Sequence, residues 1–534
     1  MENVLKSLIP SFNKPIQYRS NATLEDRVDV ISQYLSTDMS YWNLKRTLKE
    51  VIVNPTFKKE ELGTVMQKLL QETNLSTAVR NAIYLYDKEA KSKARLPPSG
   101  PSPTIPVFSE SIEAIEQARC QWDTRLRYEL RSVASKQKRK LVQIRSFDDT
   151  KEEPEYLIRF VYTSEDLLET ITAIDNSNSA HAPFKWGLIK AVIKTPSLPS
   201  LRATYKELKP DSRQIGVDDT LLGLEWFKQE RLDAGEKLLQ EAYIPTLKQY
   251  AKTGVPPSLR PRIWLAAMGV TIGQKEYLHF EQLLTQVQEW DLITDDLTRF
   301  DVQETADNDE FFVFEEVLDE MMLAFTRDPE VRTMCALAPN TAVLKAVPSK
   351  GLASRRSKDR LFIDAIPPCT IIPYHRQTMF AAPLCFLFPR ADEAYFLFRA
   401  MYCRYFSRLH TISSEPNTIL YLCAMFENLL QTRHPECFAH CVRIGVHPLS
   451  ITFPWMFSAF AGWMEVEQVL LFWDRLIAFD SLELVALLAC GIFLYRSKSV
   501  LSAQTVDEVQ EIFREMCNLK VIPILQQFLF APGK

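Results

Sequence analysis

From about residue 236 to its end, the chain carries apolar residues at the spacing of α-helices rather than of β-strands. Residues on one helical face recur every three or four positions. Two such faces consist of Phe314, Val317, Leu318, Met321, Met322 and Phe325, and of Ile419, Leu422, Met425, Phe426 and Leu429. Residues 482–494 are apolar almost all round, which predicts the buried central helix of a bundle. The presence of only 14 glycines also favours a helix-dominated fold over a turn-rich β fold.

Length and composition exclude several classes of protein. A chain of 534 residues is too long for one ordinary core, so we expect two or more domains. The net charge of −4 creates no global field that would attract nucleic acid. The apolar run at residues 485–495 is too short to span a bilayer, and the N-terminus lacks the apolar stretch of a signal peptide. The ten cysteines lie mostly in apolar runs, which predicts free thiols in a reducing cytosol.

The sequence predicts five regions, most of them helical. Residues 1–94 form an N-terminal helical region, and 95–110 form a proline-rich linker. Residues 111–148 form a basic amphipathic helix, 149–235 a mixed connecting region, and 236–525 a C-terminal helical domain. We therefore expect a mainly α-helical protein with little β structure.

The expected helix at 111–148 ends in a cluster of cations, namely Lys136, Lys138, Arg139, Lys140 and Arg145. One interpretation is a peripheral contact with an anionic membrane surface or an acidic partner. The other is a helix C-terminus whose cations complement the helix dipole on a solvated face. The small size of the cluster favours the second interpretation.

The connecting region contains one candidate strand, at residues 188–193, where apolar and β-branched residues follow one another. Two adjacent acids, Asp218 and Asp219, come soon after Gly216. Adjacent acids at such a position are usually a solvated helix start, and we do not interpret them as a metal site.

Histidines and cysteines gather between residues 434 and 447, and such side chains can bind zinc. They are His434, Cys437, His440, Cys441 and His447. A structural zinc site usually needs a loop that brings four ligands together. Cys437 and Cys441 instead lie one turn apart on an expected helix, beside the apolar Phe438 and Val442. We therefore expect neither a metal nor another cofactor.

The most informative motif is Gly254–Trp264, GVPPSLRPRIW, which predicts a turn followed by a helix that carries Arg260 and Trp264 one turn apart. About thirty residues later come Ile293, Asp296 and Arg299. An arginine held out from a helical scaffold can reach a nucleotide bound to another protein, where a guanidinium stabilises the charge of phosphoryl transfer. The chain shows no phosphate-binding loop or nucleophile motif of its own.

These blocks resemble the TBC-domain family, the GTPase-activating proteins of Rab GTPases. The opening motif with Arg260 and Trp264 comes first, and Ile293, Asp296 and Arg299 match the family's I-x-x-D-x-x-R. Three later blocks follow in the same order, Ala382-Pro383-Leu384, Pro435-Glu436 with Ile451 to Trp455, and Leu471 to Leu476. The resemblance extends over about 230 residues and implies an all-α Rab-GAP domain. Within it we expect Trp264 and Trp473 to be anchors of the core.

The resemblance implies a partner and a chemistry. The partner is a Rab-family GTPase in its GTP-bound form, to which the TBC domain supplies an arginine and a glutamine in trans. Arg299 matches the arginine finger, and Asp296, three residues before it, is placed to hold the guanidinium ready. The alternative for Arg299 is an ordinary surface ion pair.

The glutamine is where this sequence departs from the family pattern. Counting back from Ala382 without a gap places His375 at the glutamine position, with Pro373 and Arg376 at the flanking tyrosine and glycine. An imidazole cannot present the donor and acceptor of a carboxamide together, and Arg376 adds bulk. A two-residue gap would align Gln377 instead, but on a helix such a shift rotates the side chain by roughly 200°.

Two functions therefore remain open at the level of the sequence. The first is GTPase activation through an arginine finger. The second is a catalytically weak TBC domain that binds a Rab as an effector or scaffold. For either function we expect a cytoplasmic protein, located peripherally on intracellular membranes.

Overall fold

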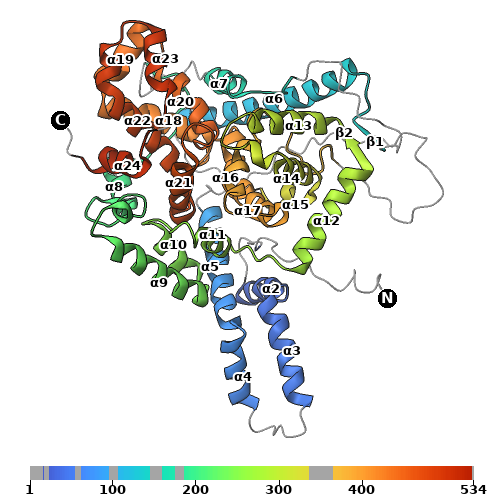
Figure 1. The fold of residues 1–534 in the computed structure, drawn as a ribbon. Helices are drawn as coiled ribbons and strands as arrows, with labels where there is room; N and C mark the ends of the chain where they lie inside the picture. The colour runs from blue at the N-terminus through green and yellow to red at the C-terminus, as the bar shows by residue number, and fades with distance from the viewer. Residues whose placement is uncertain are drawn as a thin grey trace.

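The computed structural model describes residues 16, 23–53, 62–94, 106–144, 159–174, 186–335, 365–516 and 518–531. Within these residues the chain is built almost entirely from helices, and the strands are two three-residue segments, β1 and β2. The main body is a bundle of helices, and a smaller group of N-terminal helices projects from it (Figure 1). The expected mainly α-helical fold is confirmed.

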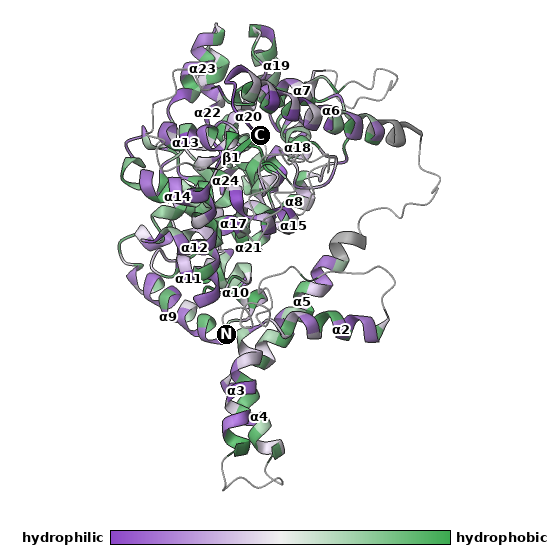
Figure 2. Cartoon of the chain, turned by 90° about the vertical axis from the view of Figure 1, so that its right-hand side faces the viewer, coloured by the Kyte–Doolittle hydropathy of each residue, from purple (hydrophilic) through white to green (hydrophobic). Residues whose placement is uncertain are grey.

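The described part of the N-terminal region contains the helices α2 Leu24–Leu35, α3 Met39–Val53, α4 Leu62–Glu72 and α5 Leu75–Ala94. Helix α2 begins at a capping box, in which Thr23 and Asp26 satisfy each other's free backbone N–H groups. Two small apolar clusters hold these helices together, and both are separate from the main core. Helices α3 and α4 extend away from the main body in both Figures 1 and 2.

Helix α5 connects this N-terminal unit to the main body through polar contacts. The Asn81 side chain donates a hydrogen bond to the Ala242 carbonyl at 2.9 Å and accepts one from the Ile244 N–H at 3.1 Å. About two turns further along α5, Lys88 forms an ion pair with Asp480. The N-terminal region thus docks through a few specific polar groups rather than through a continuous apolar interface.

The basic helix differs from its expected bounds. Helix α6 covers Pro106–Lys136, so it begins inside the expected linker and ends well before residue 148. The chain then forms strand β1, Val142–Ile144, which pairs antiparallel with β2, Trp290–Leu292. The remainder of the proline-rich stretch, residues 95–105, and Arg145 lie outside the described residues.

The connecting region carries helices α7 Ser164–Thr172, α8 Leu198–Thr204 and α9 Glu225–Glu241. The strand expected at residues 188–193 is wrong, because this segment is irregular. The N–H groups of Leu188 and Ile189 donate to the Glu427 carboxylate at 2.8 and 3.2 Å instead of to a neighbouring strand. Asp218 and Asp219 lie in a short 3-10 helix, Asp218–Thr220, and accept hydrogen bonds from the backbone N–H groups of Gln214 and Gly216.

The C-terminal region is a continuous helical domain. Its helices are α10 Ile244–Ala251, α11 Arg260–Met268, α12 Gln274–Glu289, α13 Ile293–Ala306, α14 Glu315–Arg327, α15 Pro329–Met334, α16 Ala382–Cys385, α17 Ala391–Arg404, α18 Ile419–Arg433, α19 Pro435–Ile444, α20 Pro448–Phe457, α21 Val466–Phe479, α22 Glu483–Ser502, α23 Val506–Arg514 and α24 Val521–Phe530. One hydrophobic core joins them to residues of α6 and α7, including Trp122 and Leu167. The core therefore does not begin at residue 236, and it includes the preceding helices.

Helix α22 is the central helix that the sequence predicted. By length and composition it could cross a membrane, but its apolar residues are buried against α18, α20 and α24 inside this fold. Gly491 allows α24 to approach, because a Cβ at this position would lie 2.7 Å from an atom of Ile524. The arrangement is that of a core helix in a bundle.

Candidate functional site

The first and last motifs meet in a buried polar cluster. Asp474, on α21, accepts hydrogen bonds from the Arg260 guanidinium at 3.1 Å and from the Trp264 indole at 2.7 Å, both on α11. The Val255 N–H also donates to Asp474, at 3.2 Å. Trp264 and Trp473 are both 0% exposed, which confirms them as core anchors. Arg260 is likewise buried, so its role is to hold the motif helices together and not to contact a partner.

Arg299 lies in the middle of α13 and is partly exposed, with 29% of its side chain accessible. Its Nε lies 3.8 Å from the Asp319 carboxylate on the neighbouring helix α14. This is a loose contact, because a charge-assisted hydrogen bond measures about 2.7–2.9 Å. The guanidinium is therefore held near the surface without being enclosed by protein.

The start of α13 is held by buried polar contacts, which fix the position of the helix that carries Arg299. Asp295 caps the helix by accepting from the Leu292 N–H at 3.1 Å. The same carboxylate accepts two hydrogen bonds, of 2.5 and 2.6 Å, from the buried Arg327 guanidinium of α14. Since both residues are buried, the pair rigidly joins α13 to α14.

The role expected for Asp296 needs correction. Asp296 forms an ion pair with Arg139, which comes shortly after the end of α6, and Arg139 also pairs with Asp291. The i, i+3 spacing suggested that Asp296 would hold the guanidinium of Arg299, whereas the guanidinium of Arg299 lies beside Asp319. The aspartate of the motif thus anchors α13 to the segment that follows α6.

His375 lies on a loop beside α13. Its Nε2 lies 3.3 Å from the Glu304 carboxylate of α13, and 36% of its side chain is exposed. Its backbone N–H donates to the Tyr162 carbonyl at 3.3 Å. Burial and the neighbouring Arg376 lower the pKa of His375 below its ordinary value of 6.5, so the imidazole is neutral at pH 7.

Arg376 occupies the family's glycine position and adopts the backbone conformation that favours glycine, with φ of +69°. Its N–H donates to the Asp301 carboxylate at 2.5 Å, and the Thr378 N–H donates to the other oxygen at 2.6 Å. These two hydrogen bonds hold the loop against α13. The Arg376 side chain turns back to donate to the Gly462 carbonyl at 3.0 Å and lies over the Trp463 ring. The Arg376 side chain, which we expected to add bulk at the site, therefore points towards Gly462 and Trp463 instead.

Gln377 is not presented at the surface. It is 4% exposed, and its backbone N–H donates to the Tyr374 carbonyl at 3.2 Å. In this structure Gln377 is therefore not placed to act as a glutamine finger, whereas the side chain of His375 is partly exposed.

Both sequence-predicted residues are associated with α13. Arg299 lies on this helix, and His375 contacts Glu304, which is five residues further along, at about 7.5 Å of helix rise and roughly 140° of rotation from Arg299. A guanidinium and a neutral imidazole therefore lie at the surface along one helix. The first can stabilise negative charge on a partner's nucleotide, and the second can offer one acceptor nitrogen to a water molecule.

Sequence reasoning missed three contacts at this site. Glu304 follows the motif but belongs to no recognised pattern, and Asp319 lies on another helix. Phe160 comes from the connecting region and packs against His375, with 4.9 Å between ring centroids. No local signal marks such residues, because each is brought to the site by tertiary packing.

The histidine and cysteine cluster does not assemble as a metal site. Cys437 and Cys441 are buried, whereas the Nε2 of His440 faces the Ala503 carbonyl at 2.9 Å and that of His447 faces the Trp186 carbonyl at 3.0 Å. Imidazoles directed at separate carbonyls do not converge on one ion.

Another group of metal-binding side chains, His279, Asp328 and Glu330, does converge within the described residues. However, the Arg399 guanidinium pairs with Asp328 at 2.8 Å and with Glu330 at 2.9 Å. A cationic side chain therefore already pairs with both carboxylates of this group. The arrangement is a structural ion pair and not a metal site.

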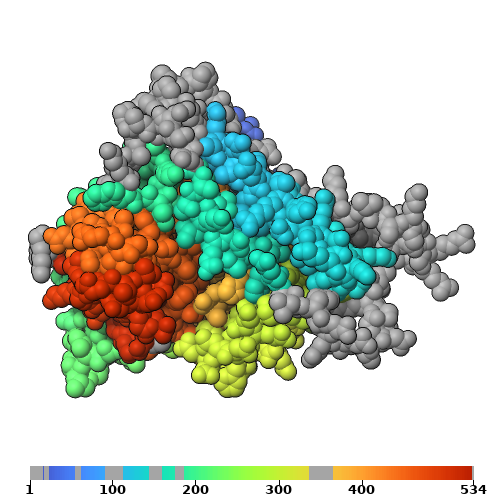
Figure 3. Space-filling view, turned by 90° about the horizontal axis from the view of Figure 1, so that it is seen from above, coloured from blue at the N-terminus to red at the C-terminus, as the bar shows by residue number. Residues whose placement is uncertain are grey.

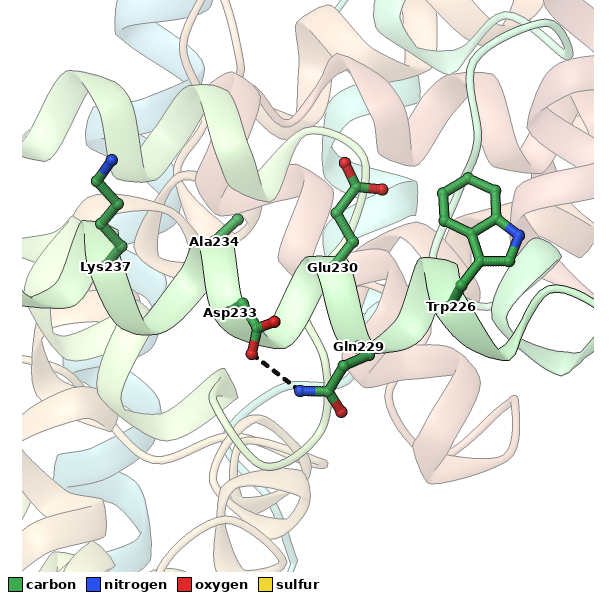
Figure 4. Close-up of a pocket in the computed structure, with 6 residues that line it drawn as sticks. All are labelled: Trp226, Gln229, Glu230, Asp233, Ala234 and Lys237. Carbon is green, nitrogen blue, oxygen red and sulfur yellow. Dashed lines mark hydrogen bonds between the residues drawn. The ribbon is translucent and has the colours of Figure 1, made fainter.

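A shallow surface hollow lies elsewhere, on helix α9. It is lined by Trp226, Gln229, Glu230, Asp233, Ala234 and Lys237. Figure 4 shows these side chains along one helix, with the Gln229 amide donating to Asp233 at 2.8 Å. Figure 1 shows α9 at the opposite end of the main body from α13. This hollow is therefore not part of the surface around Arg299 and His375, which we call the finger site.

Comparison with known proteins identifies the class. Residues 373–501 match the model of the Rab-GTPase-TBC domain, a range that includes His375 but not Arg299. The chain is also 32% identical over 520 residues to a curated human protein, with 94% of this chain and 97% of that protein covered. The chain therefore belongs to the TBC-domain family. That human relative is TBC1 domain family member 19.

A solved structure is also similar. The crystal structure of the Chlamydomonas flagellar RabGAP TBC domain matches with a TM-score of 0.40 and 14% sequence identity, covering 64% of this chain and 98% of that chain.

Proposed function

We propose that this protein is a GTPase-activating protein that supplies Arg299 in trans to the GTP bound by a Rab-family GTPase. The observation that carries the proposal is the placement of Arg299, which is partly exposed on a rigidly anchored helix and only loosely held by Asp319. A finger residue must be positioned before the GTPase arrives and must still be free to move onto the phosphates. Membership of the TBC-domain family supports a Rab as the partner.

The chemistry assigned to Arg299 is electrostatic. During GTP hydrolysis negative charge spreads over the transferring phosphoryl group, and a guanidinium directed at it stabilises the transition state. An arginine finger accelerates hydrolysis by roughly 10³- to 10⁵-fold. The Asp319 contact is easily exchanged for a phosphate, because both groups are partly exposed and the contact is long.

His375 supplies less than the family's glutamine would. A neutral imidazole accepts one hydrogen bond and donates one, from different edges of the ring. With Nε2 facing Glu304, only Nδ1 is left for the attacking water. We therefore expect partial activity, restricted to Rabs whose own glutamine positions that water.

The second candidate function is Rab binding without activation, as an effector or scaffold. The substitution of glutamine by His375 favours it, because the residue that orients water is the one that has changed. In either case we propose that the chain acts in the cytoplasm, peripherally on membranes that carry the GTP-bound Rab. Three exposed lysines, Lys136, Lys138 and Lys140, remain available for an anionic membrane surface.

A single set of measurements separates the two functions. The purified full chain is tested against a panel of GTP-loaded Rabs, with GTP hydrolysis and binding affinity measured for each. Activation predicts at least one Rab whose hydrolysis accelerates. Binding of a GTP-loaded Rab with no change in its hydrolysis rate would instead support the scaffold.

A further inference from the structure

The segment immediately before α7 reaches the finger site. The Phe160 ring packs against two other rings, with centroids 4.9 Å from His375 and 5.0 Å from Phe300 of α13. Phe160 and Phe300 are half-buried and lie outside the main hydrophobic core. This ring stack is thus a feature of the protein surface and not a continuation of the core.

The neighbouring Tyr162 anchors this segment. It is buried, and its ring stacks on Tyr374 at 5.0 Å and packs edge-on against Trp122 of α6 at 5.2 Å. Its carbonyl accepts the hydrogen bond from the His375 N–H. The backbone of the His375 loop and the Phe160 ring are therefore held by the same anchored residues.

The segment that follows α6 makes a second attachment to the site. Arg139 pairs with Asp291 of β2 and with Asp296 at the start of α13, and strand β1 pairs with β2. The Ile293 N–H also donates to the Leu141 carbonyl at 3.1 Å. Figure 3 shows α6 in cyan on the same face of the molecule as the yellow-green segment that includes α13 and α14. Both halves of the finger site are thus attached to residues that precede the expected TBC boundary.

We propose that Phe160 is a positioning residue that fixes the His375 imidazole and, with it, forms part of the surface that meets the GTPase. This inference rests on the function proposed above. The ring of Phe160 packs against the imidazole at an interplanar angle of 39°, and Glu304 contacts Nε2. These two contacts restrict how the imidazole can turn, which leaves Nδ1 as the nitrogen available to a water molecule on the GTPase.

The electrostatic surroundings of His375 agree with this role. Burial is the first cause of its lowered pKa, and Arg376 is the second. The groups that face it are Glu304 on α13 and Arg376 on its own loop, and the Phe160 ring supplies part of the apolar cover. Removing that cover exposes the imidazole to water and raises its pKa towards 6.5.

The test compares four proteins: the full chain, Phe160→Ala, Phe160→Tyr and Tyr128→Ala. Phe160→Tyr keeps the ring, and Tyr128, an exposed residue of α6, provides a matched aromatic truncation away from the site. The pKa of His375 is measured by NMR on histidine-labelled protein, with its signal assigned by its loss in His375→Gln. We expect Phe160→Ala to raise this pKa and the other two variants to leave it unchanged.

The second readout is stimulated hydrolysis by a responsive Rab. Misplacement of a catalytic contact lowers kcat. We expect Phe160→Ala to reduce the kcat of stimulated hydrolysis about tenfold, and Phe160→Tyr to keep it within about twofold of the value for the unmutated chain. Thermal unfolding of each variant tests whether it is folded, and Phe160→Leu replaces Phe160→Ala if the latter is unfolded.

An unchanged pKa of His375 in Phe160→Ala, or in Phe160→Leu where it replaces that variant, overturns the inference. If the full chain activates no Rab, the proposed function fails, while the NMR measurement still decides the positioning.

Discussion

Arg260 holds Asp474 in a buried, two-point ion pair across 214 residues of sequence, with both nitrogen–oxygen distances at 3.1 Å. The same carboxylate accepts a hydrogen bond from Trp264, so one aspartate joins the opening motif to the last motif block. Because the groups are buried, each depends on the others for its hydrogen bonds. The motif residues Arg260 and Asp474 thus belong to the scaffold that supports the finger site.

We predict that Arg260→Ala destabilises the fold by about 3–5 kcal/mol, because it leaves the Asp474 carboxylate buried without its main partner. Denaturant unfolding of the full chain measures this change. The control is Arg262→Ala, two residues away, whose pair with Glu236 is exposed and should contribute less than about 1 kcal/mol. Equal stability of the two variants would contradict the structural role of the Arg260–Asp474 pair.

Trp264 provides an independent test of the core. We expect Trp264→Ala to lower the free energy of unfolding by about 3–5 kcal/mol, since the whole side chain is buried and its removal leaves a cavity. Trp226 on α9 is more than half exposed and offers a matched control, for which we expect a change near zero. A small effect of Trp264→Ala on thermal unfolding would argue against this packing.

The joint between α5 and the main body contains more positive than negative charge. Lys88, Lys248 and Arg404 all contact the single carboxylate of Asp480. Burial, followed by repulsion from Arg404, lowers the pKa of Lys88 to about 6. An unfolded lysine titrates near 10.5, so between pH 6 and about 10.5 the unfolded chain binds more protons at this residue. The contribution of Lys88 to stability therefore increases as the pH rises through this range.

We predict that Lys88→Met is neutral or stabilises the chain by about 1 kcal/mol at pH 7, because the buried Lys88 must lose its proton on folding, which costs free energy that a methionine does not incur. It should also weaken the increase in stability between pH 7 and pH 9. Thermal unfolding at both pH values checks this, with Lys68→Met, from an exposed pair on α4, as the control. A large loss of stability in Lys88→Met alone would show that its ion pair with Asp480 dominates.

The fold was predictable because helical periodicity is a local signal. The apolar faces of α14 and α18, and the all-apolar α22, follow directly from residue spacing. The irregular segment at residues 188–193 was not predictable, because its N–H groups donate to Glu427, which lies more than 230 residues away. A strand and an extended segment capped by a distant carboxylate have the same local pattern.

The candidate site was only half predictable, for the same reason. Motif spacing identified Arg299 and His375, and their partial exposure agrees with a site at the surface. The partner of Asp296 was misassigned because the i, i+3 rule considers one helix, whereas Arg139 arrives from another segment. Phe160 follows no periodic pattern, so only the tertiary structure reveals its contact with His375.

We predict that His375→Gln raises the stimulated hydrolysis rate roughly tenfold, which corresponds to one gained hydrogen bond of about 1.4 kcal/mol. The carboxamide can both accept from and donate to the attacking water and the GTPase, and the Arg376 side chain is turned away from the site. Single-turnover hydrolysis with a responsive Rab measures the change. A rate that stays the same or falls would show that His375 does not occupy the water-orienting position.

The central claim is that Arg299 acts on the partner's GTP. Its most direct test is single-turnover GTP hydrolysis by a responsive Rab with the full chain, with Arg299→Ala and with Arg514→Ala, the last removing an exposed arginine far along the sequence. We predict that Arg299→Ala loses roughly 10³-fold of stimulation, while Arg514→Ala keeps all of it and both variants still bind the Rab. Full stimulation by Arg299→Ala would contradict the claim.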